Sequence, residues 1–331
     1  MPVKPSLIAS LLAGFDAITN HVELVLFPLA LDLFLWLGPH LKLKSFVEQI
    51  LTQFGTLPGV DSAEAGQILD FNRQIWLLFA DRLNLFTVLR TYTVGIASLM
   101  ASRQPLATPL EGHLAWDLTS LGGIIIWWFT LSLVGVVCGA LYYSLVAQAS
   151  LNGKVDWRSV INQWPWAALQ ALILSAMMYA VLLAISIPGS CVITASALGG
   201  LPVAQFTILL FGALMLWILF PFFFSAHGIF TFQYQVWTSI KQGARLTRLT
   251  LPKTSLLFLI IVVISQGLDT LWSVPPENSW MTVIGVTGHA FISTGLLAAS
   301  FIYYRDASRW VQRLIQQSLM VESKNLRERI T

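Results

Sequence analysis

Two ionisable side chains, Asp32 and His289, lie deep within apolar stretches of the sequence. A charge inside hydrocarbon costs at least about 2.5 kcal/mol, so such residues usually face the interior of a helical bundle. We count the residues between each side chain and the outer end of its apolar stretch. At the helical rise per residue, the depths of Asp32 and His289 then differ by about 5 Å. We therefore expect Asp32 and His289 to face each other, directly or through water. Such a pair indicates a proton relay or a ligand site. The structural alternatives are a neutral or interface-hydrated Asp32 and a His289 that is a hydrogen-bonded packing residue.

Two rows of basic residues recur at helical spacing, namely Lys241, Arg245 and Arg248, and Arg305, Arg309 and Arg313. Near an anionic leaflet each such cation contributes about 1 kcal/mol of attraction. Trp237, Ile240 and Ala244 flank the first row and are expected to enter the acyl chains. The rows indicate anchoring at the cytoplasmic interface or, as the sharper alternative, a binding site for a particular lipid headgroup or an acidic partner.

The sequence contains none of the common catalytic, metal-binding or cofactor-binding motifs. Its five histidines lack the spacing of a metal site, and there is no phosphate-binding loop, dinucleotide fingerprint or nucleophile elbow. Cys138 and Cys191 offer no disulfide framework. Asp269, near the outer end of a predicted span, is expected to meet water or to cap its helix. We therefore expect no catalytic residue, no metal, no cofactor and no nucleic-acid partner.

The composition predicts an all-α membrane protein. The chain of 331 residues is 56% hydrophobic and 11% charged, whereas soluble domains are about 25% charged. Several apolar runs approach the roughly 20 residues that a helix needs to cross hydrocarbon. Thirteen tryptophans suit a chain with many membrane interfaces, where amphipathic rings lie at headgroup depth.

We expect a polytopic helical bundle of six spans in three hairpins, with amphipathic helices at the interface. The spans are predicted near residues 21–41, 118–146, 166–188, 201–226, 252–272 and 281–304. An interfacial helix over residues 5–19 precedes the first span, a charged connector over 152–163 precedes the third, and residues 63–101 lie on the outer leaflet or dip partly into it. The chain then divides into an interfacial helix and first span (1–41), an extracytoplasmic helical insertion (42–117), a five-span bundle (118–304) and a cytoplasmic juxtamembrane helix and tail (305–331).

The basic residues orient these spans. The loops 189–200 and 274–280 contain no lysine or arginine, whereas thirteen of the nineteen lie in the connections and tails of the other side. An excess of Lys and Arg in short loops marks the cytoplasmic side. We therefore expect a multi-pass protein of the bacterial cytoplasmic membrane with both termini in the cytoplasm. The first 20 residues lack a cleavable signal pattern, so the first span is expected to be retained.

Each predicted hairpin follows a short amphipathic element, and the sequence WRSV at 157–160 is similar to WTSI at 237–240. A threefold internal repeat therefore remains open. With the stretch FQYQVWTSIKQGARLTRLTLPKTSLLFLIIVVI and the ending FIYYRDASRW, this layout resembles the multi-span membrane domain fused to some glycerophosphodiester phosphodiesterases and related bacterial membrane proteins. The resemblance covers residues 140–313 and implies amphipathic cytoplasmic helices that each introduce a span. Nothing in the chain resembles the catalytic domain, so hydrolase activity is not implied.

Three functions are compatible with these observations. The favoured one is a non-catalytic scaffold or accessory subunit associated with lipid or a membrane complex, with membrane lipids and other membrane-protein subunits as partners. The first alternative is a transporter or carrier that uses polar residues near the membrane midplane. The second is a membrane-embedded enzyme that modifies lipid, although no acid–base pair accompanies the basic rows.

Overall fold

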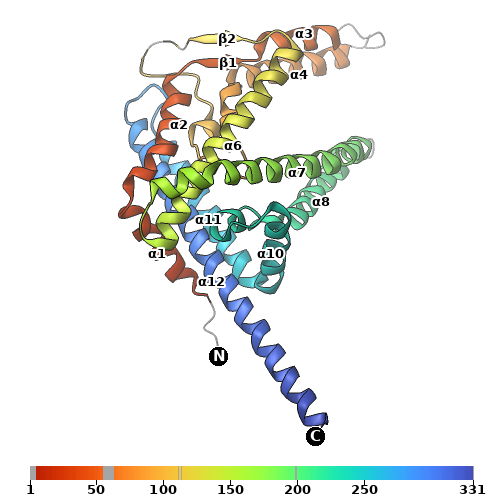
Figure 1. Ribbon diagram of the computed structural model, residues 1–331. Coiled ribbons are helices and arrows are strands. Elements are labelled where there is room, and N and C mark those ends of the chain that lie inside the picture. The colour runs from red at the N-terminus through yellow and green to blue at the C-terminus, as the bar shows by residue number, and fades with distance from the viewer. Residues whose placement is uncertain (1–4, 55–62, 111, 113, 198–199, 331) are drawn as a thin grey trace.

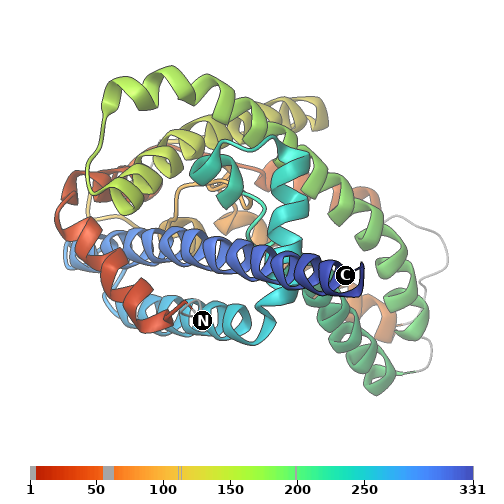
Figure 2. The same ribbon diagram turned by 60° about the horizontal axis from the view of Figure 1, so that its bottom comes forward.

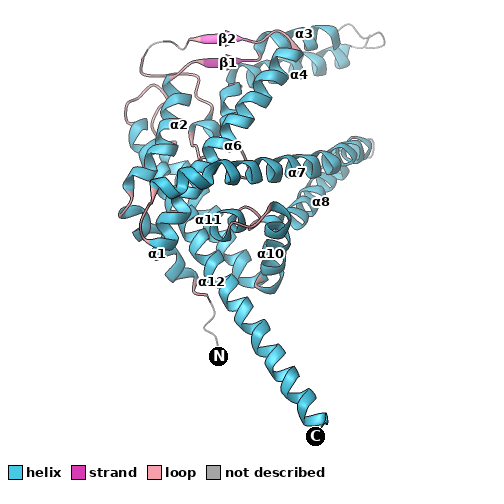
Figure 3. Ribbon diagram, viewed as in Figure 1, coloured by secondary structure: helices cyan, strands magenta, loops and turns pink. Residues whose placement is uncertain are grey.

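The computed structural model describes the backbone of residues 5–54, 63–110, 112, 114–197 and 200–330. The described chain is almost entirely helical, with one short two-stranded sheet (Figures 1 and 3). Its elements are α1 (Leu7–Thr19), η1 (Val22–Val25), α2 (Leu26–Leu37), β1 (His40–Lys42), α3 (Lys44–Phe54), α4 (Ala63–Arg82), η2 (Leu85–Leu89), α5 (Met100–Arg103), β2 (Ala115–Asp117), α6 (Leu121–Asn152), α7 (Trp157–Ala197), α8 (Leu201–Leu219), η3 (Phe220–Phe222), α9 (His227–Phe232), α10 (Val236–Leu249), α11 (Leu251–Trp272) and α12 (Thr282–Ile330).

Five helical stretches of the described chain are long and apolar enough to cross a membrane. They are α6, α7, α8 with its continuation to Phe232, α11 and the first part of α12. A sixth span results if α1 and the η1–α2 helix, which meet at 92°, count as one broken span. The predicted all-α bundle of about six spans is therefore confirmed. The cytoplasmic location of the two termini stays a prediction.

Helix α12 is the central helix of the bundle, and α1, α2, α6 and α11 pack against it (Figure 2). The closest approach is at Gly14 of α1, where an added Cβ would lie 2.5 Å from the backbone nitrogen of Ala299. Small residues allow helices to pack closely in a membrane, where lipid tails are as apolar as leucine. Helix α12 continues without a break to residue 330, so the predicted last span and the juxtamembrane helix are a single helix.

The predicted first span, residues 21–41, is wrong in its shape. Its helix α2 has 12 residues, which is about 18 Å of helix and too short to cross hydrocarbon of about 30 Å alone. Helix α2 ends at Gly38 in extended backbone, as expected because the next residue, Pro39, cannot continue a helix. Before it, the Asn20 side chain donates to the Asp16 carbonyl at 2.9 Å, which closes α1 and lets the chain change direction.

Helices α7 and α8 form a long hairpin that extends away from the bundle (Figure 1). The predicted connector 152–163 and loop 189–200 are therefore largely wrong, because α7 is helical from Trp157 to Ala197. The Asp156 carboxylate accepts a first-turn backbone N–H at 3.1 Å, which explains the early start of the helix. No residue of α8 is buried, so its apolar surface is free to contact lipid or a partner.

Within the predicted insertion 42–117, strand β2 and helices α3 and α4 form a cap with β1 at the end of the molecule opposite the end of α12 (Figures 1 and 3). Strands β1 and β2 pair in parallel, with Leu41 opposite Trp116, and α3 packs on α4. Between residues 83 and 104, which we call the inserted segment, the chain leaves the cap and enters the bundle. The sequence predicted that residues 63–101 lie on the outer leaflet or dip partly into it, and it did not predict that part of this stretch enters the protein bundle, whereas α4 belongs to the cap.

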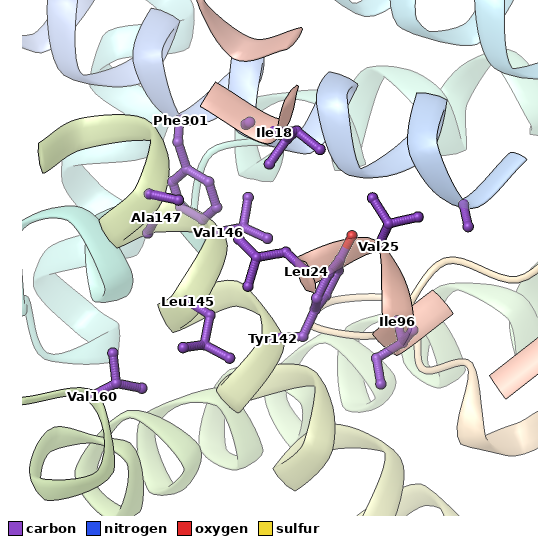
Figure 4. Close-up of a cluster of buried hydrophobic side chains, with 13 residues drawn as sticks. Ile18, Leu24, Val25, Ile96, Tyr142, Leu145, Val146, Ala147, Val160 and Phe301 are labelled. Carbon is purple, nitrogen blue, oxygen red and sulfur yellow. The ribbon is translucent and has the colours of Figure 1, made fainter. Parts of the chain in front are cut away.

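One buried apolar cluster shows how the inserted segment is held (Figure 4). Ile96 of the segment lies in this cluster with Leu24 and Val25 of η1, Tyr142 of α6 and Phe301 of α12. Fully burying a large apolar side chain contributes about 1.5–3 kcal/mol. The inserted segment is therefore part of the core and not a surface loop.

Candidate functional site

The inserted segment lies against two glycines of α6. An added Cβ at Gly135 would come within 2.5 Å of the Leu89 carbonyl oxygen, and one at Gly139 within 2.7 Å of the Val94 carbonyl oxygen. These glycines lie roughly 21 and 27 Å from the start of α6 at the helical rise. Residues 90–99 are neither helix nor strand. Within a membrane, such backbone is tolerated where it is buried in protein or lines a cavity.

Asp32 of α2 anchors this segment. Its carboxylate accepts the Ser98 hydroxyl at 2.5 Å and the backbone N–H groups of Met100 at 2.9 Å and Leu99 at 3.1 Å. The Asp32 side chain is fully buried. A buried carboxylate requires such donors, and hydrogen bonds to a charged group are worth about 1.5–3 kcal/mol each. Asp32 therefore has a structural role at the turn that begins α5.

His289 of α12 pairs with Asp269 of α11. The His289 Nδ1 nitrogen lies 2.7 Å from the Asp269 carboxylate, which accepts its hydrogen bond. The two helices run antiparallel from a short connection, so residues near their outer ends meet. The sequence predicted that Asp269 meets water or caps its helix; its side chain is partly exposed, and the pair with His289 was not predicted. His289 is the hydrogen-bonded packing residue that the structural alternative described.

The structure corrects the direct form of the predicted contact between Asp32 and His289, whereas a contact through water stays a prediction. Among the described residues no hydrogen bond joins them, because Asp32 binds the inserted segment and His289 binds Asp269. Both side chains are nevertheless buried on helices that pack together, and an electrostatic interaction reaches from His289 to Asp32. Their similar depth stays a prediction, and depth alone does not say which partner a side chain binds.

The row Lys241, Arg245 and Arg248 lies on the exposed face of α10. The opposite face packs into the protein through Gly243 and Leu246 among others. Ile240 is 8% exposed and belongs to a core cluster, so its predicted insertion into acyl chains is wrong. Its position on the helix places it on the buried side.

The second predicted row divides into two parts. Arg305 is half-buried and forms an ion pair with Asp306 at 2.8 Å, so its charge is already compensated. Arg309 and Arg313 are exposed, and no ion pair of theirs occurs within the described chain. The free cationic surface on α12 is therefore smaller than the sequence predicts.

A notch of about 140 Å³ separates α10 from α12. Arg245 lines it together with Gln242 from α10 and with Ser308 and Gln312 from α12. Tyr234 also contributes to its wall. These groups supply several hydrogen-bond donors around one guanidinium, which suits an anionic oxygen. Arg245 is thus the residue that joins the exposed basic row to a concave site.

A larger cavity of about 430 Å³ lies between the inserted segment and helices α6, α7, α9, α11 and α12. Neither Asp32 nor His289 lines it. Its polar lining comes from hydroxyl groups, from His227 and from Arg90, whose guanidinium donates to the Ser98 carbonyl at 3.0 Å. Its size falls within the range of small-molecule sites.

No family model, curated protein or solved structure matches this chain. The resemblance to the membrane domain of glycerophosphodiester phosphodiesterases therefore stays a prediction. Among the described residues, no group of three His, Cys, Asp or Glu side chains is placed to hold a metal ion.

The sequence did contain one signal for the larger cavity. His227 is the single ionisable residue in the apolar run 201–232, and a lone ionisable group in such a run marks a functional site by default. The remaining lining residues are mostly serines, threonines and apolar side chains. They could not be recognised from the sequence, because the inserted segment that brings them together was not predicted at this depth.

Proposed function

We propose that this protein is a non-catalytic integral membrane protein that binds anionic lipid headgroups at one membrane surface, where it acts as a scaffold or accessory subunit. The observation that carries the proposal is the position of Arg245, which belongs both to the exposed basic row and to the notch beside α12.

The place of α10 in the fold supports a membrane-surface location. This helix of 14 residues is too short to cross hydrocarbon, and it leads directly into the apolar helix α11. A short amphipathic helix that introduces a span lies naturally at the lipid interface. One of its faces is held by the protein, so the cations of the other face remain available to lipid.

Trp237 strengthens this placement. Its side chain is 60% exposed, and the Lys241 ammonium lies 5.3 Å from the centre of its ring. Tryptophan is enriched at headgroup depth, and a lysine stem can lie along apolar surface while its charge stays in water. Trp237 and Lys241 together therefore resemble an interfacial anchor next to the notch.

The scaffold part of the proposal rests on the α7–α8 hairpin. Large apolar side chains remain exposed along it, including Phe206 at 67% and Trp217 at 77%. A hairpin that extends away from its own bundle offers a long surface to neighbouring membrane-protein subunits or to lipid. This surface favours a role in assembly over a closed, self-sufficient bundle.

Native mass spectrometry of the purified full-length chain tests the lipid proposal. The protein is equilibrated with phosphatidylglycerol or phosphatidylcholine, and the bound lipid is counted. We expect a preference for phosphatidylglycerol that the triple variant Lys241→Glu, Arg245→Glu, Arg248→Glu abolishes. The charge-conserving variant Lys241→Arg, Arg245→Lys, Arg248→Lys is the matched control and should retain it.

The notch makes a finer prediction. Arg245→Ala should weaken phosphatidylglycerol binding more than Arg248→Ala, because only the former removes a guanidinium from the concave site. Equal effects of the two variants would indicate that the lipid is attracted to the basic row as a whole and not to the notch. An unchanged lipid preference in the triple charge-reversal variant would overturn it.

The two alternative functions receive less support. None of the described residues that line the notch is Asp or Glu, so the lipid-modifying enzyme still lacks a carboxylate beside its cations. The carrier that uses Asp32 and His289 receives no support from the large cavity, because neither residue lines it.

A further inference from the structure

The large cavity contains a histidine with an unused hydrogen-bonding atom. His227 Nε2 lies 2.8 Å from the Ser300 hydroxyl oxygen, and that hydroxyl donates to the Leu297 carbonyl at 2.7 Å. Because a hydroxyl has one hydrogen, Ser300 must accept from His227 Nε2. In a neutral ring the Nδ1 nitrogen is then a bare acceptor. His227 Nδ1 is buried and has no partner in the structure.

A second residue that lines the cavity also has a buried polar atom without a hydrogen-bond partner. The Ser225 hydroxyl is buried without a hydrogen-bond partner, and the Ser225 side chain is 2% exposed. A buried polar group left unpaired costs about 1–3 kcal/mol. Both residues line the cavity although the two atoms themselves are covered, so a molecule with its own donor and acceptor would satisfy them after a small side-chain rotation.

The shape of the cavity favours a molecule larger than water. Its volume of about 430 Å³ is far above the roughly 30 Å³ that one water occupies. Much of its wall is apolar, with Leu174 and Met178 from α7 and Leu296 from α12. Tyr92 lines the cavity and is 89% exposed, so the cavity is open at this residue.

The charge of the lining restricts the headgroup. None of the described lining residues is a carboxylate, and Arg90 is the single permanent cation among them. A cationic headgroup would therefore find no counter-ion, whereas a hydroxyl group could donate to His227 Nδ1 and pair with Ser225. An acyl chain would fill the apolar part of the cavity.

We propose that this cavity binds a single-chain lipid alcohol, with its hydroxyl group on His227 and Ser225 and its acyl chain along the wall formed by α7 and α12. The inference goes beyond the proposed headgroup site, because the cavity shares no lining residue with the notch beside α10. Either site can fail without the other.

The test compares two probes that have the same chain. Equilibrium binding of radiolabelled 1-oleoylglycerol and of methyl oleate, which has no hydroxyl, is measured on the full-length protein in nanodiscs. We expect 1-oleoylglycerol to bind about fivefold to tenfold tighter, as one additional hydrogen bond provides. In His227→Phe this ratio should fall about fivefold to tenfold below that of the wild type, and differences in membrane partition cancel because the ratios of two proteins are compared.

A cavity-filling variant provides the second measurement. Ser265 of α11 lines the cavity, so Ser265→Phe should reduce the binding of both probes at least about tenfold. Ser255 lies on the same helix, is exposed and does not line the cavity. Ser255→Phe is therefore the matched control and should bind like the wild type.

Two results would overturn the proposal. One is a His227→Phe variant that has the same ratio between the two probes as the wild type. The other is a Ser265→Phe variant that binds 1-oleoylglycerol as the wild type does, which would place the lipid elsewhere on the surface. If His227→Phe does not fold, Ser225→Ala serves for the same comparison and should lower the ratio in the same direction.

Discussion

The carboxylate of Asp32 accepts the hydroxyl hydrogen of Ser98, which lies 66 residues further along the chain. This bond joins α2 to the inserted segment at a point where the backbone is neither helix nor strand. The carboxylate is tolerated in an apolar helix because the turn at residues 98–100 provides hydrogen-bond donors for its oxygens. The donors of this turn would otherwise lack acceptors.

Replacing Asp32 should therefore loosen the inserted segment. Asp32→Asn keeps the volume but directs an amide N–H₂ toward a backbone donor, so we expect a loss of about 1–3 kcal/mol in the free energy of unfolding. Unfolding in mixed micelles measures it. Asp16→Asn is the control, since Asp16 is exposed on α1 and its removal should change little. Equal stability of both variants would contradict the anchoring role.

The glycines of α6 make a steric prediction. Gly139→Ala places a Cβ within 2.7 Å of the Val94 carbonyl oxygen, so the inserted segment must move, at a cost of about 1–3 kcal/mol. Gly122→Ala on the same helix meets nothing within 4 Å and should be neutral or slightly stabilising, because alanine favours a helix. Hydrogen exchange of residues 90–99 should rise in the first variant and not in the second.

Double-mutant cycles distinguish the observed pair from the one predicted from the sequence. The cycle of Asp269→Ala with His289→Ala should give a coupling energy of about 1–3 kcal/mol, because the two side chains share a hydrogen bond. The cycle of Asp32→Ala with His289→Ala should give a smaller coupling energy than the first, because no hydrogen bond joins these two side chains among the described residues. A larger coupling in the second cycle would restore the sequence-based pairing.

The connection between α11 and α12 holds the other end of the inserted segment. Glu277 lies 3.8 Å from the Arg103 guanidinium and accepts the Leu106 backbone N–H at 2.9 Å. Arg103 also donates to the Pro275 carbonyl at 2.7 Å. Glu277→Gln should cost about 1 kcal/mol and speed hydrogen exchange near residue 106, whereas Glu48→Gln, an exposed carboxylate of α3, should do neither.

The fold class could be predicted because it depends on composition and on the length of apolar runs. Helix α11 begins and ends within one residue of its predicted bounds, whereas α6 begins three residues after its predicted start and ends six residues after its predicted end. The first span could not be predicted in its true shape, since the bend at Asn20 depends on a side-chain hydrogen bond that competes with the helix. The hairpin of α7 and α8 was predicted, but the full length of α7 was not, because small residues near Pro188 indicated a loop, although the helix continues through them.

The site could be predicted where it depends on one helix and not where it depends on several. The spacing of Lys241, Arg245 and Arg248 placed them correctly on one face of α10. The partners of Asp32 and His289 come from other elements, so single-helix spacing carries no information about them. The large cavity requires the inserted segment, whose depth is set by its contacts with Gly135 and Gly139.

The insertion of residues 83–104 into the bundle is the claim on which the cavity depends, and cross-linking tests it most directly. The Thr93 and Ser175 hydroxyl groups are hydrogen-bonded to each other, so cysteines at these positions are close enough to form a disulfide. In a background with Cys138 and Cys191 replaced by serine, mild oxidation of membranes should cross-link Thr93→Cys to Ser175→Cys. The pair of Thr93→Cys and Ser186→Cys should stay reduced, because residue 186 lies roughly 16 Å beyond residue 175 along α7. Cross-linking of the second pair and not of the first would contradict the insertion.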